Sequence, residues 1–173
     1  MKKLVLLSMV AMLLAGCGAQ PVFETLGAVP AQAETVAAQQ MLVQLPGDML
    51  TPALQSEDTG TLYICDEFTM SLITLPGGDL ERTVRTCTGF SQESLTLMRH
   101  GDDTVKRYDL AWSAAGEGAL QTCRGVILDD GNYHYVLTVM ADAALAGDLA
   151  DKWQYIFDTF RLSGQPTPVN IGS

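Results

Sequence analysis

The chain has 173 residues, 47% of them hydrophobic, and its 20 acidic residues outnumber 10 basic ones, which gives a formal net charge of −10 at pH 7. This length suits one domain with a single core, and the apolar content excludes an intrinsically disordered chain. A field of this sign repels nucleic acid and anionic lipid headgroups, so we exclude nucleic-acid binding and expect a monomer.

The first 16 residues have the composition of a secretion signal. Lys2 and Lys3 form a basic start, and an apolar run follows over residues 4–15. This run is too short to span a hydrocarbon core of ~30 Å, which needs roughly 20 residues. We therefore predict a signal peptide over residues 1–16.

Small residues lead from this run into a cysteine, in the order Leu14, Ala15, Gly16 and Cys17. The ending resembles the lipobox of bacterial lipoproteins. That resemblance implies cleavage between Gly16 and Cys17 and lipidation of Cys17, which would anchor the protein on the extracytoplasmic face of the cell membrane. Two acyl chains at ~0.8 kcal/mol per buried CH₂ are enough for stable anchoring. An uncleaved signal anchor or a buried N-terminal helix is the alternative.

Composition divides the rest of the chain into three parts. Residues 17–38 are rich in Ala, Gln and Pro and predict a flexible tether with an r.m.s. reach on the order of 25 Å. Residues 39–163 form the predicted domain. Pro166 and Pro168 indicate a disordered tail over residues 164–173.

The first half of the domain is patterned as strands and one short helix. Residues 41–45 are strand-like, and the runs at 61–65 and 68–75 predict a hairpin. A helix is predicted over 80–88, because Asp79 suits its N-cap and Gly89 its end. The apolar stripe of that helix comprises Leu80, Val84 and Cys87.

The second half predicts a meander and a long helix. Short turns at 101–103 and 129–132 force antiparallel neighbours among four strands, expected at 94–99, 104–113, 119–128 and 133–140. Asp142 is the expected cap of a helix over 143–160 that lies on the sheet. Its apolar stripe comprises Leu145, Leu149, Trp153, Ile156 and Phe160.

This order of elements, from the strand that ends in Leu45-Pro46-Gly47 to the closing Ile156-Phe157 and Phe160-Arg161-Leu162, resembles the PsbP-like family. The resemblance implies an α+β fold, an α/β/α sandwich in which an antiparallel sheet of about six to seven strands is covered by helices. Members of the family mostly bind other proteins and share no catalytic motif. The resemblance therefore implies a binding or accessory module.

The other three cysteines, Cys65, Cys87 and Cys123, have no C-x-x-C spacing that would indicate a zinc site. Each lies in an apolar stripe, so we expect three buried free thiols. A single disulfide between any two of them in an oxidising compartment is the alternative, and the sequence does not rank the three pairings.

Few residues suggest catalysis or a cofactor. The chain has two histidines, of which His134 is expected to be structural or on the surface, and His100 to lie in a solvated turn rather than in a metal site with the neighbouring carboxylates. The turn at 129–132 offers oxygen ligands but lacks the closing Glu of an EF-hand loop. No nucleophile motif or P-loop is present. We expect neither an enzyme nor a metal or cofactor site.

The predicted contact surface is a sheet face that carries Arg107, Asp109 and Arg124, and we add Trp112 and Tyr135 as aromatic candidates. The leading hypothesis is a membrane-anchored, non-catalytic binding or accessory module for an unidentified envelope protein. The alternative is a carrier that holds a small or apolar ligand between the sheet and the C-terminal helix. A hydrolase with an unrecognised site is the third hypothesis.

Overall fold

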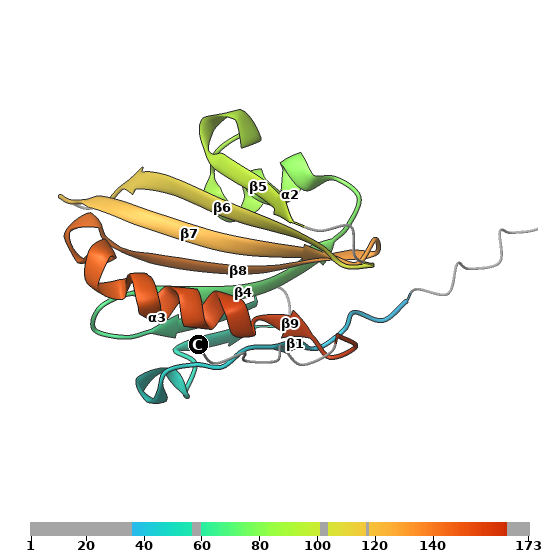
Figure 1. Ribbon diagram of the computed structural model, residues 1–173, viewed down its shortest axis with the longest axis horizontal. Coiled ribbons are helices and arrows are strands. Elements are labelled where there is room, and N and C mark those ends of the chain that lie inside the picture. Colours follow the sequence, from blue (N-terminus) through green and yellow to red (C-terminus); the bar gives the residue numbers. More distant parts are fainter. Residues whose placement is uncertain (1–35, 57–59, 101–103, 117, 166–173) are drawn as a thin grey trace, which may run out of the picture. The chain divides into compact units, whose positions relative to one another are not determined.

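The structure is a computed structural model that describes residues 36–56, 60–100, 104–116 and 118–165. Its centre is a seven-stranded antiparallel sheet with the strand order β2-β3-β4-β8-β7-β6-β5 (Figure 1). The strands are β2 (Leu54–Ser56), β3 (Gly60–Ile64), β4 (Thr69–Pro76), β5 (Thr96–His100), β6 (Lys106–Ala115), β7 (Leu120–Asp129) and β8 (Tyr133–Asp142).

The strands β5 to β8 follow one another in the sheet as the predicted meander, and β3 and β4 form the predicted hairpin. Gly131 has φ +90° in the tight turn between β7 and β8, a conformation that suits glycine. The predicted fold class is confirmed: the chain is α+β, with an antiparallel sheet between helices.

The helix α2 (Leu80–Thr88) has the predicted bounds because its two ends are specified locally. Asp79 accepts a hydrogen bond from the Arg82 N–H, and Gly89 ends the helix in the left-handed conformation, φ +78°. Val84 of this helix is fully buried and packs on one face of the sheet against Leu110 and Ile127.

The helix α3 (Ala146–Thr159) lies on the opposite face of the sheet and covers the larger core (Figure 1). Trp153 is 1% exposed and meets Phe68 edge to face, with 6.1 Å between ring centroids. Leu137 of β8 and Val126 of β7 lie in the same core. Burial of this apolar face is what holds α3 on the sheet.

A second, two-stranded sheet joins the two ends of the domain: β1 (Met41–Leu42) pairs with β9 (Arg161–Leu162). The strand β1 is shorter than the strand predicted over residues 41–45. The strand β9 was not predicted. Pairing between segments about 120 positions apart depends on tertiary packing rather than on local pattern. The edge strand β2 was missed because it has only three residues.

The long helix begins later than predicted. Residues Ala143–Leu145 form a 3₁₀ turn (η3), in which Asp142 accepts a hydrogen bond from the Ala144 N–H. This turn rotates Leu145 away from the core, and its side chain is 39% exposed. The prediction that Leu145 belongs to the buried stripe was therefore wrong, whereas Leu149, Trp153 and Ile156 are buried as expected.

The signal peptide, Cys17 and most of the tether lie outside the described residues, as does the tail from residue 166. Their boundaries stay predictions. Within the part of the chain that is described, no helix is long and apolar enough to cross a membrane.

Candidate functional site

Arg107 and Asp109, two of the predicted surface residues, lie on the face of the sheet that α3 covers. Arg107 Nε donates to Asp109 Oδ1 at 2.8 Å, and Arg107 Nη1 donates to the Phe157 carbonyl at 3.1 Å. Phe157 lies in the last turn of α3, and its carbonyl also accepts from the Phe160 N–H at 3.4 Å. His100 Nε2 lies 2.9 Å from the other Asp109 oxygen. This cluster fastens the end of α3 to the sheet.

Arg124 is on the same face, because it pairs in register with Ala111 of β6. Its guanidinium carbon lies 5.5 Å from the centroid of the Phe157 ring, a cation–π contact. The expectation of an open sheet face here was therefore wrong. The alternation of side chains shows which residues share a face, but it does not show which face a helix covers.

Tyr135 lies in the core beneath α3 and is fully buried. The prediction that it belongs to a contact surface was therefore wrong. Its hydroxyl donates to Asp130 Oδ2 at 2.9 Å and accepts from the Gln39 N–H at 2.8 Å. Burial raises the pKa of Tyr135 to about 12. These bonds tie the start of the domain to the turn between β7 and β8.

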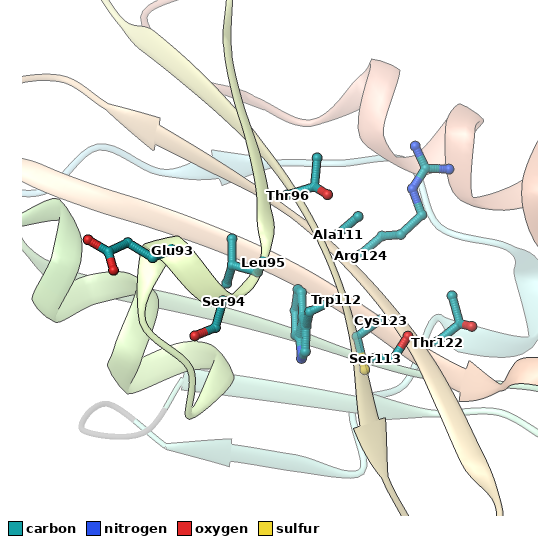
Figure 2. A pocket seen from close by; sticks show the side chains of 10 residues that line it. All are labelled: Glu93, Ser94, Leu95, Thr96, Ala111, Trp112, Ser113, Thr122, Cys123 and Arg124. Atoms are coloured by element: carbon teal, nitrogen blue, oxygen red, sulfur yellow. The ribbon is translucent and has the colours of Figure 1, made fainter.

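Trp112 faces the other side of the sheet and borders an open groove at the sheet edge. The strand β6 pairs with β7 over its whole length, but β5 begins at Thr96, opposite Ala111. Beyond that point, residues 112–115 have no strand partner on the outer side within the described chain. A groove of about 560 Å³ lies here between the η2 turn (Gln92–Ser94) and the end of β6 (Figure 2).

The groove spans the edge of the sheet and has walls from both faces. Trp112 and Leu95 belong to the α2 side, whereas Arg124 and Thr122 belong to the α3 side (Figure 2). Its remaining lining residues are Glu93, Ser94, Thr96, Ala111, Ser113 and Cys123. Arg124 and Glu93 are its two ionised side chains, so the groove offers one cation, one anion, hydroxyl groups and an indole surface.

A buried polar cluster that the sequence analysis missed lies between α2 and β8. Thr83 Oγ1 lies 2.6 Å from His134 Nδ1, and His134 Nε2 is 3.9 Å from Asp129 Oδ1. The order hydroxyl, imidazole, carboxylate is that of a hydrolase triad. However, Thr83 and His134 are each 2% exposed and Asp129 is 8% exposed. The cluster is closed to a substrate and acts as a structural connection.

The carboxylates of the tight turn before β8 accept hydrogen bonds from backbone N–H groups of the same turn. Asp129 Oδ1 accepts from the Gly131 N–H at 2.8 Å, and Asp130 Oδ1 accepts from the N–H groups of Asn132 and Tyr133 at 2.9 and 2.8 Å. Desolvation opposes ionisation of Asp130, but these bonds prevail and lower its pKa. Across the described residues, no group of three or more His, Cys, Asp or Glu side chains is arranged to hold a metal ion.

Comparisons with known proteins add information on the fold. No protein-family model matches this sequence, and no curated protein matches it significantly. A solved structure from Bacteroides thetaiotaomicron is 15% identical, with a TM-score of 0.50; the match covers 76% of this chain and 50% of that one. This chain therefore spans about half the length of that protein. The likeness is one of fold.

Two other solved structures match over most of their length. LpqN of Mycobacterium tuberculosis, described as involved in cell envelope biogenesis, is 17% identical with a TM-score of 0.44, and the match covers 76% of this chain and 85% of LpqN. PA94 of Pseudomonas aeruginosa, described as a putative regulator, is 14% identical with a TM-score of 0.41, and the match covers 79% and 89% of the two chains. The PsbP-like resemblance stays a prediction.

Proposed function

We propose that this protein is a lipid-anchored, extracytoplasmic binding module without catalytic activity, and that it accepts an extended segment of another envelope protein in the groove beside β6. The basic and apolar leader and Cys17 in the sequence support the anchor. The observation that carries the binding role is the end of β6, where four residues extend beyond the last pair with β5.

An unpaired strand edge is a template for another strand. Its N–H and C=O groups are positioned to pair with a peptide backbone, which supplies affinity independent of sequence. Ser113 is exposed at this edge and does not obstruct it. The groove therefore accepts a short extended segment next to residues 112–115.

The two sides of the groove supply selectivity. Alternate side chains of an added strand point to opposite faces of the sheet. A residue on one side would meet the indole of Trp112, and the next would lie near the guanidinium of Arg124. We therefore expect a segment that alternates an apolar residue with an acidic or amide side chain.

The carrier alternative has less support. Its ligand would lie between the sheet and α3, where Trp153 and Tyr135 are at most 1% exposed and pack in one continuous core. The hydrolase alternative also lacks support, since the triad-like cluster of Thr83 and His134 is buried.

Site-specific photocrosslinking in the native membrane tests the groove. A photoreactive residue at Ser113 should give a crosslinked adduct, and one at Gln154, exposed on α3, should not. Arg124→Gln should reduce the Ser113 adduct roughly tenfold, since a charge-assisted hydrogen bond contributes ~1.5–3 kcal/mol. Arg82→Gln, an exposed arginine of α2, is the matched control.

Equal adducts at Ser113 and Gln154, or none at Ser113 in protein that reaches the membrane, would contradict the proposal. So would an adduct that Arg124→Gln and Arg82→Gln reduce equally. Either of the first two results would exclude the end of β6 as the docking position, and the third would exclude Arg124 as a selective contact.

A further inference from the structure

A second cavity lies on the α2 face of the sheet, next to the C-terminal end of that helix. The helix α2 has 9 residues and is ~13 Å long, whereas β8 has 10 residues and runs ~33 Å. The helix therefore covers only part of its face. Where it ends, a cavity of about 240 Å³ opens between Cys87 and Thr88 of the helix and the strands β3, β4 and β6 to β8.

The floor of this cavity consists of residues that are paired in register across the sheet and therefore share one face. One row of the floor runs from β4 to β6 and comprises Thr69, Met140, Cys123 and Trp112. The next row runs from β3 to β8 and comprises Leu62, Ser71 and Thr138. Ala114 extends the first row along β6, because it lies two positions after Trp112 and so on the same face.

The floor is accessible beyond the end of α2. Met140 is 39% exposed, and Ile64, the register partner of Thr69 on β3, is 57% exposed. The side chains of Trp112 and Cys123 point to one side of the strands (Figure 2). Exposed apolar side chains that gather on one face of a domain mark a contact site for an apolar partner.

The lining of the cavity is uncharged. Among the described residues around it, none is an acid, a base or a histidine. Burial raises the pKa of Cys87 to about 11 and also raises the pKa of Cys123, so both thiols are neutral at pH 7. An ionised ligand would lose water here without gaining a counter-charge, which is costly. The lining therefore selects neutral ligands.

The lining also offers a polar contact. The hydroxyl groups of Ser71 and Thr138 lie 2.6 Å apart and bond each other. This bond uses one of the two O–H donors, so the other O–H is able to donate to a ligand oxygen. The cavity thus combines an apolar floor with one pair of hydroxyl groups.

We propose that this cavity binds a neutral, largely apolar small molecule that carries a hydroxyl or carbonyl oxygen at one end. The volume sets its size. An apolar cavity of about 150 Å³ holds benzene, so one of about 240 Å³ holds a ligand of roughly ten non-hydrogen atoms. The apolar part would lie over Met140 and Leu62, and the oxygen would bond the hydroxyl pair of Ser71 and Thr138. A medium-chain alcohol such as 1-octanol has this chemistry.

The cavity is distinct from the other two ligand positions in this domain. It lies on the opposite face of the sheet from the core beneath α3. It also differs from the groove beside β6, although Trp112 and Cys123 line both. The inference therefore does not rest on the docking of an extended segment in that groove.

The test is photolabelling of the full chain, isolated from its native membrane, with a diazirine analogue of 1-octanol and mass spectrometry of the labelled peptides. Labelling should saturate and should include lining residues that the groove lacks, such as Met140, Thr138 and Cys87. Excess 1-octanol should prevent it. Octanoate should compete at least ~30-fold less well at pH 7, because its carboxylate would be buried without a partner.

Two pairs of variants locate the ligand. Ala114→Phe should reduce labelling at least ~10-fold, because the larger side chain fills the cavity from β6. Ala115→Phe is its matched control, since this exposed neighbour lies on the other face of the strand. Thr138→Val should weaken competition by 1-octanol roughly 2- to 10-fold by removing a hydroxyl at constant shape, and Thr86→Val, exposed on α2, should not.

Labelling that does not saturate, equal competition by octanoate and 1-octanol, or equal losses in Ala114→Phe and Ala115→Phe would overturn the proposal. So would a label confined to groove residues such as Ser113 and Thr122. Unchanged competition in Thr138→Val would exclude the hydroxyl pair as the polar contact. None of these results affects the docking of a protein segment beside β6, which the crosslink from Ser113 tests separately.

Discussion

Thr83 and His134 connect α2 to the sheet through one hydrogen bond, 2.6 Å between Oγ1 and Nδ1, and both side chains are 2% exposed. The helix otherwise contacts the sheet through apolar residues such as Val84. A single polar contact between two buried groups fixes the position of α2 because neither group has water as an alternative partner.

Thr83→Val should destabilise the domain by ~1–3 kcal/mol, because it keeps the side-chain shape but leaves His134 Nδ1 buried without its partner. Chemical denaturation measures this loss. Thr86→Val is the control, since Thr86 lies exposed on the same helix and its hydroxyl bonds only the Arg82 carbonyl. Equal losses for the two variants would show that the buried bond contributes nothing.

His134 should make the domain sensitive to acid. Burial lowers its pKa below the ordinary value of 6.5, although the carboxylate of Asp129 opposes this shift. Below pH 6.5 the unfolded chain therefore binds the proton more readily than the folded one, and stability falls as the pH drops. The slope from this group is at most ~1.4 kcal/mol per pH unit.

The measurement is urea denaturation at pH 7.5 and pH 5. The difference in unfolding free energy between the two pH values should be smaller in His134→Gln than in the wild type. If His134→Gln loses as much stability as the wild type on acidification, another group is responsible.

Trp153→Ala should cost ~3–5 kcal/mol, because the indole fills the core beneath α3 and its loss leaves a cavity beside Phe68. Tyr155→Ala, on the exposed side of the same helix, should cost less than ~1 kcal/mol. Thermal or denaturant unfolding compares the two. A small loss for Trp153→Ala would mean that the helix presents another face to the sheet.

The sequence was most informative where local chemistry specifies structure. The bounds of α2 were predicted because Asp79 and Gly89 mark its ends, and the meander because its turns are short. The stripe through Trp153 identified the buried side of α3. Leu145 was misplaced because the 3₁₀ turn that displaces it has no distinct sequence signal.

The candidate site was less predictable because it depends on the relative lengths and the register of neighbouring strands. Trp112 was selected as an aromatic candidate, but the groove beside it exists because β5 is shorter than β6. Likewise, Cys87 and Cys123 are far apart in sequence, and both line one cavity because α2 packs on the same face of the sheet.

The central claim is that a lipid anchors this domain outside the cell. Its most direct test is the mass of the N-terminal peptide of the protein isolated from its native membrane. We predict a peptide that begins at Cys17 and carries the mass of attached acyl chains, and its absence from a Cys17→Ser variant. A peptide that begins at Met1 and has no acyl mass on Cys17 would contradict the account.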